Sequence, residues 1–167
     1  MKNSRFSSKF LARASALTAL ALGLSYVEVL IPFSIGIPGV KLGLANIVIV
    51  YALYTLDGRY AVLINVCRVM LSALLFGSVF SMLYALSGAA LSLMVMLLLK
   101  KPNIFGVCAV SAAGGVFHNL GQLLTAMFVV KTSRIILYFP LLVFSGLTAG
   151  VLNGFITVLC MKRLTKF

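Results

Sequence analysis

The sequence predicts an all-α integral membrane protein, a bundle of six transmembrane helices with both the N- and the C-terminus in the cytoplasm. Of its 167 residues, 62% are hydrophobic and 10% are charged, whereas soluble domains have about 45–50% apolar and about 25% charged residues. The mean hydropathy is +1.17. The apolar runs are continuous and do not alternate with polar residues, which favours helical spans over a membrane barrel. Since no polar linker divides the chain, we expect one transmembrane domain over residues 1–167, with a short basic tail at 1–11.

Six apolar runs approach the roughly 20 residues that a helix needs to cross a hydrocarbon core about 30 Å thick. They cover residues 12–32, 41–56, 60–77, 79–99, 105–129 and 136–160. The first run follows a basic segment and contains Ala19-Leu20-Ala21, which resembles a signal-peptide cleavage site. Because this run continues as far as Pro32, we expect it to be retained as a span.

Glycine, proline and charged residues separate the later runs, and the connections are short, as is typical of neighbouring helices in a bundle. The separators are Pro38-Gly39 before the second run, Asp57 to Arg59 before the third, Gly77-Ser78 before the fourth, Lys100 to Pro102 before the fifth and Lys131 to Arg134 before the sixth.

The basic residues set the expected orientation. With a cytoplasmic N-terminus, ten of the 14 Lys and Arg residues fall on the inner side: Lys2, Arg5, Lys9, Arg13, Arg59, Lys100, Lys101, Lys162, Arg163 and Lys166. Three fall outside, namely Lys41, Lys131 and Arg134. This excess follows the positive-inside rule. The net charge of +12 is therefore interpreted as a topology signal and a contact with anionic lipid, not as a nucleic-acid interface.

Arg68 lies in the middle of an apolar segment from Tyr60 to Phe76. A guanidinium at bilayer depth costs about 2.5–3.5 kcal/mol even on the lenient insertion scale, so it needs a partner, a water-filled cavity or a bound anion. A buried ion pair with Glu28 is one interpretation. Bidentate binding of an anionic ligand is the other.

Further polar residues fall in the predicted outer halves of the spans. Lys41 lies in the first turn of the second run, where free backbone N–H groups and a positive charge favour an anion. Asn46 follows it in the same run, and Tyr84 lies in the fourth. Alternatively, Lys41 extends toward lipid headgroups without binding a ligand.

His118, Asn119 and Gln122 share one face of the fifth run. Three hydrogen-bonding side chains on one transmembrane face either join helices or line a pocket. A single His without acidic neighbours does not predict a metal site.

Several classes of function are disfavoured. The chain has no phosphate-binding loop and no Asp-rich prenyltransferase motif, and its two acidic residues cannot build a magnesium-carboxylate centre. Cys67, Cys108 and Cys160 form no paired motif and are expected to be buried thiols. We therefore expect neither a cofactor nor catalysis by this chain alone.

Three ordered segments, with Arg68 between the first two, resemble a known membrane family. They are Pro38–Asn46 (PGVKLGLAN), Leu75–Ser81 (LFGSVFS) and His118–Leu123 (HNLGQL). The chain is similar to the Gx transporter family, also described as heptaprenyl diphosphate synthase component I. That family is related to the substrate-binding S components of energy-coupling factor transporters. The resemblance implies a multi-pass protein of the bacterial plasma membrane that works with a separate coupling membrane protein and ATPase subunits. It also implies that Ala12 and Ala16 contact the coupling protein.

The expected function is capture, from the outer face, of a small anionic micronutrient or isoprenoid-related molecule. The predicted substrate site comprises Lys41, Asn46, Arg68, Tyr84, His118, Asn119 and Gln122. The alternative is a membrane accessory subunit of a heptaprenyl or polyprenyl diphosphate synthase in isoprenoid-quinone biosynthesis. A stand-alone carrier is less consistent with the sequence, because internal repeats and more ion-binding groups are expected there.

Overall fold

The computed structural model describes residues 8–31 and 42–164, and these residues form helices joined by short turns, with no strand among them. The elements are α1 (Ser8–Leu30), α2 (Leu44–Thr55), α3 (Gly58–Phe76), α4 (Val79–Lys100), α5 (Val107–Val130), the 3-10 helix η1 (Ser133–Tyr138) and α6 (Phe139–Leu164). The prediction of an all-α protein is confirmed. In the part of the chain that the structure describes, five helical segments are long and apolar enough to cross a membrane, and α2 is a shorter apolar helix.

Local hydrogen bonds explain where two of the helices begin. The Asp57 carboxylate accepts from the backbone N–H of Gly58 at the start of α3. At the start of α4, Ser78 and Ser81 form a reciprocal capping box, in which each side chain accepts from the other residue's backbone N–H. Side-chain oxygens at these positions satisfy N–H groups that a helix leaves unpaired. The separators Asp57 to Arg59 and Gly77-Ser78 therefore lie where helices end and begin, as expected, whereas Pro38-Gly39 lies outside the described residues.

Helix α2 differs most from the sequence prediction. A span was expected over residues 41–56, but the described helix covers only Leu44–Thr55. Twelve residues at about 1.5 Å each reach about 18 Å, which is less than the thickness of the hydrocarbon core. Its N-terminal flanking residue, Gly43, is in the left-handed conformation with φ 70°. This conformation favours glycine, and the helix begins only at the next residue, Leu44.

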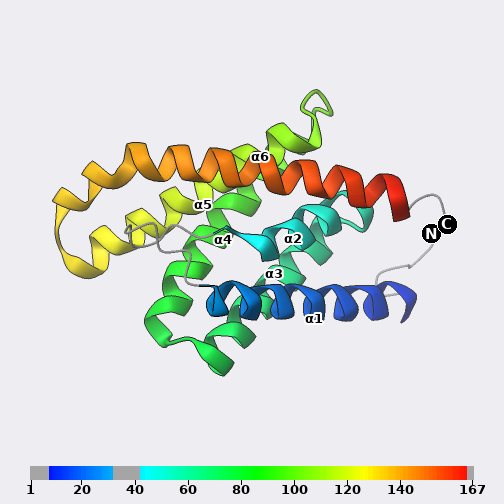
Figure 1. Cartoon of the computed structure of the whole chain (residues 1–167), viewed down its shortest axis with the longest axis horizontal. Helices are drawn as coiled ribbons and strands as arrows, with labels where there is room; N and C mark the ends of the chain where they lie inside the picture. Colours follow the sequence, from blue (N-terminus) through cyan, green and yellow to red (C-terminus); the bar gives the residue numbers. More distant parts are fainter. Residues whose placement is uncertain (1–7, 32–41, 165–167) are drawn as a thin grey trace, which may run out of the picture.

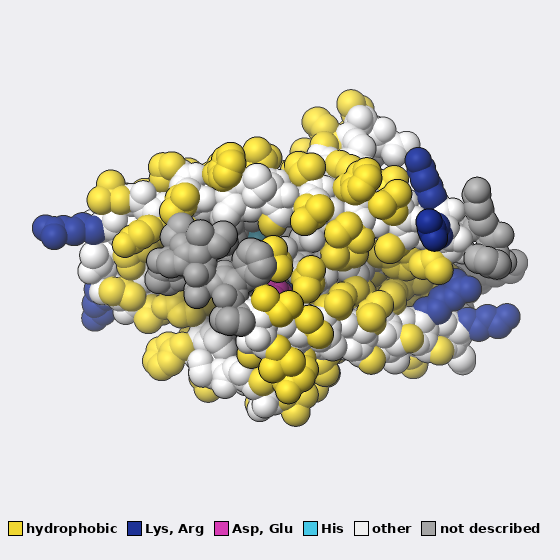
Figure 2. All heavy atoms as spheres, viewed as in Figure 1, with side chains coloured by type: hydrophobic (Ala, Val, Ile, Leu, Met, Phe, Trp, Pro, Cys, Tyr) yellow, Lys and Arg dark blue, Asp and Glu magenta, His cyan; other side chains and the backbone are white. Residues whose placement is uncertain are grey.

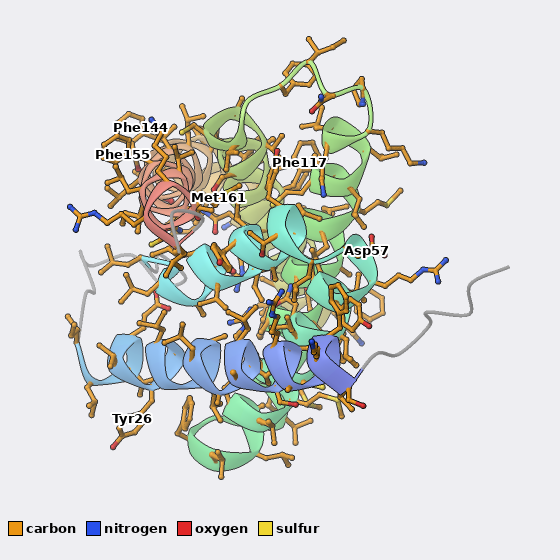
Figure 3. All side chains as sticks on the ribbon, turned by 90° about the vertical axis from the view of Figure 1, so that its right-hand side faces the viewer. Tyr26, Asp57, Phe117, Phe144, Phe155 and Met161 are labelled. Atoms are coloured by element: carbon orange, nitrogen blue, oxygen red, sulfur yellow. The ribbon has the colours of Figure 1, made fainter. Side chains whose placement is uncertain are left out.

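The arrangement of the helices fits a membrane environment. The first residues of α1 and the last residues of α6 lie at the same end of the molecule (Figure 1). On the face drawn in Figure 2, Lys and Arg side chains gather toward the two ends, with hydrophobic side chains between them. Large apolar residues are exposed on the outside, such as Phe144 and Phe155, which project from α6 away from the other helices (Figure 3). A lipid-facing surface accounts for this exposure.

The short helix α2 contributes heavily to the protein interior. Its residues Ile49, Val50, Ala52 and Leu53 are buried in one hydrophobic cluster that also includes Ile64 of α3. Hence α2 is a central element packed among longer helices, and its first residues lie inside the bundle.

Helices α4, α5 and α6 approach closely through glycines. A Cβ atom at Gly150 of α6 would lie 2.6 Å from the Cα of Ala112 on α5, and a Cβ at Gly121 of α5 would lie 2.7 Å from the Ser87 carbonyl oxygen on α4. Small residues of this kind allow membrane helices to pack backbone against backbone. Helix α5 is thereby fixed between α4 and α6.

Candidate functional site

Each of the six α-helices among the described residues contributes to a cavity of about 240 Å³ inside the bundle. We call it the charged cavity, because the lining includes Glu28 of α1 and Arg68 of α3. Five of the seven predicted substrate-binding residues line it: Asn46, Arg68, His118, Asn119 and Gln122. The predicted residue Lys41 lies outside the described residues. Three helices, α2, α3 and α5, therefore bring together predicted side chains that are far apart in the sequence.

Arg68 has both a partner and an unused donor. Its Nη2 donates to the Oδ1 of Asn65 at 2.6 Å, one turn earlier on α3. Its Nε is buried and has no hydrogen-bond partner among the described residues. Asn65 is itself 3% exposed, so it fixes the guanidinium from the protein interior. Folded proteins rarely leave an enclosed donor without a partner, and a bound ligand or an ordered water can satisfy such a group.

Glu28 interacts with Arg68 electrostatically, but the hydrogen bond that its carboxylate accepts comes from the backbone of another residue. The Oε1 of Glu28 accepts from the backbone N–H of Gly43 at 2.5 Å. A carboxylate at this position also offsets the positive end of the α2 dipole. Glu28 thus anchors the start of α2 and reduces the net positive charge of the cavity at the same time.

Asn153 of α6 holds the start of α2 from the opposite side. Its Nδ2 donates to the carbonyl oxygens of Leu42 at 3.4 Å and Gly43 at 3.1 Å. Asn153 is 3% exposed and lies near the middle of α6. Non-helical backbone within a membrane protein is tolerated where it is buried in protein or lines a cavity, and residues 42 and 43 line the charged cavity.

Asn119 joins two helices as well as lining the cavity. Its Nδ2 donates to the Leu142 carbonyl at 2.7 Å and to the Ser145 hydroxyl at 3.2 Å, both on α6. The sequence left two interpretations of this residue, a contact between helices and a pocket lining. Asn119 does both, because its amide nitrogen joins α5 to α6 and the residue also lines the cavity. His118 and Gln122 pack beside Gly88 of α4, where a Cβ would lie 3.0 Å from the Cγ of Gln122.

Tyr84 does not line the charged cavity. It lines a neighbouring cavity of about 480 Å³, which we call the apolar cavity, between α4, α5, η1 and the start of α6. The two cavities share four lining residues: Ser81, Ala85, Asn119 and Gln122. Tyr84 is therefore separated from Arg68 by the residues common to both cavities.

The sequence interpretation missed Asn65 and Asn153, which position Arg68 and the start of α2. A signal was present for Asn65, since a polar residue one helical turn before a membrane arginine is placed to accept its hydrogen bond. Asn153 lies in the predicted sixth span with no other charged or amide side chain in that span, so the sequence around it does not indicate its contact with residues 42 and 43. The glycines at 146, 150 and 154, spaced four apart on one face of α6, were an equally readable signal of close packing.

Two further predictions concern surfaces and metals. Ala12 and Ala16 are exposed on α1. A partner helix can therefore reach both residues, and the predicted contact stays a prediction. Within residues 8–31 and 42–164, no three His, Cys, Asp or Glu side chains lie close enough to hold a metal ion.

These features define a class: a helical, multi-pass membrane protein with a charged cavity within the bundle. The sequence model for heptaprenyl diphosphate synthase component I matches residues 17–160. The chain therefore belongs to the heptaprenyl diphosphate synthase component I family, as the three sequence segments indicated. Searches of curated proteins and of solved structures give no significant match.

Proposed function

We propose that this chain is the substrate-binding membrane subunit of an energy-coupling factor type transporter, and that it captures a small anionic micronutrient or isoprenoid-related molecule. The proposal rests on the Nε of Arg68. This charged donor is buried beside the charged cavity, and no described residue accepts a hydrogen bond from it. Charge-assisted hydrogen bonds to an anion are among the strongest available to a protein, and they offset the cost of keeping the guanidinium in the membrane.

The start of α2 supports the same site. Helices that begin inside a membrane protein direct the positive end of their dipole toward anionic groups. At α2 the Glu28 carboxylate already accepts from the Gly43 N–H, so this end of the helix adds to the attraction of Arg68 for an anion and does not replace it. Ala45 and Asn46, in the first turn of α2, line the charged cavity together with Arg68. We assign the positive end of the site to Arg68 and this turn, with His118, Asn119 and Gln122 orienting the remainder of the ligand.

The proposed orientation places both chain ends in the cytoplasm and the site in the outer half of the plasma membrane. Energy would come from partner subunits: a coupling membrane protein that contacts the Ala12–Ala16 face of α1, and cytoplasmic ATPases. The exposure of both alanines supports this docking face, because small residues allow a second helix to approach closely.

Ligand affinity of Arg68 variants tests the site. Arg68→Gln should lower affinity for the retained anionic ligand at least about 30-fold, since hydrogen bonds to charged groups contribute about 1.5–3 kcal/mol each before desolvation is counted. Arg68→Lys should retain part of the affinity because the charge stays while the fork of donors is lost. Affinity is measured by calorimetry on protein reconstituted in nanodiscs. Unchanged affinity in a correctly inserted Arg68→Gln protein would refute the assignment.

The family description favours a second function, a membrane accessory subunit of a polyprenyl diphosphate synthase. Affinity purification in mild detergent with mass spectrometry separates the two. ATPase subunits and a coupling protein in the complex support transport, whereas a soluble prenyl synthase supports the accessory role and would make Arg68 a structural partner of Asn65 and Glu28.

A further inference from the structure

The charged and apolar cavities adjoin, and the character of their linings changes in one direction. Glu28 and Arg68 line the charged cavity from α1 and α3. The shared residues come next, and three of the four, Ser81, Asn119 and Gln122, have uncharged polar side chains. The remaining lining of the apolar cavity is aromatic or aliphatic: Tyr84, Leu123, Ala126, Ile135, Tyr138 and Leu142. The charged cavity also has apolar lining residues, such as Phe76 and Met82, but charged side chains line only that cavity and none lines the apolar one.

The volumes indicate how a ligand divides between the two cavities. Small-molecule sites usually have about 300–1,000 Å³. The charged cavity, at about 240 Å³, lies below that range and suits a compact headgroup. The apolar cavity, at about 480 Å³, is the larger of the two. A ligand confined to the charged cavity would leave the larger space without a role.

The inner wall of the apolar cavity suits hydrocarbon. Leu123 is 3% exposed and Leu142 is 7% exposed, so both offer buried apolar surface. The amide nitrogen of Asn119, which also lines this cavity, already donates to Leu142 and Ser145 of α6. A hydrocarbon chain here would therefore leave that nitrogen with its partners on α6, whereas an unsatisfied buried donor would be costly.

We propose that the two cavities together bind one amphiphile, with a compact anionic headgroup at Arg68 and its hydrocarbon chain between Tyr84, Leu123 and Ala126. This inference rests on the proposed function for its anion site and adds the class of ligand. An anionic membrane lipid and a free amphiphile such as a long-chain phosphate share this chemistry.

The test measures binding of inorganic phosphate, butyl phosphate and octyl phosphate to the full chain in phosphatidylcholine nanodiscs. The expected result is a rise in affinity of about 200-fold from butyl to octyl phosphate, because each of the four added CH₂ groups contributes about 0.8 kcal/mol when buried. Octanol, which has the same chain and no charge, should bind far more weakly than octyl phosphate.

A matched pair of variants locates the chain. Ala126→Leu places extra carbon atoms in the apolar cavity and should remove most of the gain from chain length, leaving the affinity for inorganic phosphate unchanged. Ala90→Leu makes the same change at an exposed position of α4 that lines neither cavity, and it should alter nothing. A chain-length gain that survives Ala126→Leu would place the hydrocarbon elsewhere and overturn the inference.

Failure of this inference differs from failure of the proposed function. Affinity that depends on Arg68 but not on chain length would refute the amphiphile and leave anion capture standing. Replacing phosphatidylcholine with phosphatidylglycerol in the nanodiscs identifies the source of the ligand. Loss of octyl phosphate binding would identify an anionic membrane lipid as the competing occupant, and retained binding would identify a free amphiphile; both outcomes support the shared site.

Discussion

Two sides of the bundle are held together by different kinds of contact. Along α4, α5 and α6, glycines bring backbones together, as at Gly121 against Ser87 and Gly150 against Ala112. Around α2, by contrast, polar side chains from neighbouring helices hold backbone groups, as Glu28 and Asn153 do at Gly43. The first kind of contact depends on the absence of side chains, and the second depends on their charge and hydrogen bonds.

The comparison teaches which substitutions affect function as well as stability. Glu28 and Asn153 line the charged cavity as well as holding α2, so changing either alters the proposed site and the fold at once. The glycine seam along α4, α5 and α6 depends on shape, and its members Gly115, Gly146 and Gly150 also line the charged cavity. An alanine there adds no charge, so it can narrow the cavity while leaving the charged groups of its lining unchanged.

The largest expected effect is at the glycine seam. Gly150→Ala would place a Cβ 2.6 Å from both the Cα of Ala112 and the carbonyl oxygen of Ser111, and backbone atoms cannot move aside as a flexible side chain does. We expect a loss of about 3 kcal/mol in the free energy of unfolding, at the upper end of the cost of overpacking. Unfolding in mixed micelles with increasing denaturing detergent measures it.

Gly23→Ala is the matched control for that substitution. Gly23 lies on α1, and a Cβ there would meet no described atom within 4 Å. Alanine exceeds glycine in helix propensity by about 1 kcal/mol, so this variant should be as stable as the natural chain or slightly more so. Equal losses at Gly23 and Gly150 would contradict the assignment of close packing to the α5–α6 contact.

An intermediate effect is expected at the polar contact. Glu28→Ala removes the acceptor for the Gly43 N–H, and a hydrogen bond to a charged group contributes about 1.5–3 kcal/mol. We expect a loss of about 2 kcal/mol in the free energy of unfolding, together with faster hydrogen exchange at residues 43–46. Glu28→Gln keeps an oxygen acceptor and should lose less than half as much. Identical exchange in both variants would show that Glu28 does not anchor α2.

The sequence predicted the helices well because their boundaries are set by local chemistry. Asp57 and Ser78 are polar capping residues directly before apolar runs, and such signals act over three or four residues. It also predicted that Arg68, His118, Asn119 and Gln122 lie together, as their shared cavity shows. Polar side chains on membrane-spanning helices are costly in lipid, so they face the interior of the bundle.

The remaining features depend on tertiary contacts that no local pattern encodes. The assignment of Tyr84 to the same site as Arg68 relied on depth in the membrane, and depth does not distinguish adjoining cavities. The role of Asn153 depends on residues 42 and 43, more than a hundred positions away. The shortness of α2 follows from the left-handed Gly43, which lies inside the run predicted as a span at 41–56, and the sequence alone does not indicate that conformation.

The smallest expected effect is at the other end of α2. The Nζ of Lys100 donates to the carbonyl oxygen of Leu53 and lies 5.1 Å from the centre of the Tyr54 ring. A cation near the last carbonyls stabilises a helix through its dipole. Lys100→Met should therefore cost about 1 kcal/mol in the free energy of unfolding. Lys101→Met is the control, because this neighbouring lysine is exposed and its replacement should change stability little.

The double variant tests whether α2 is held at both ends. If it is, the losses in the free energy of unfolding from Lys100→Met and Glu28→Ala should be additive, since the two contacts share no residue. A combined loss well below the sum would mean that releasing one end of α2 already frees the other.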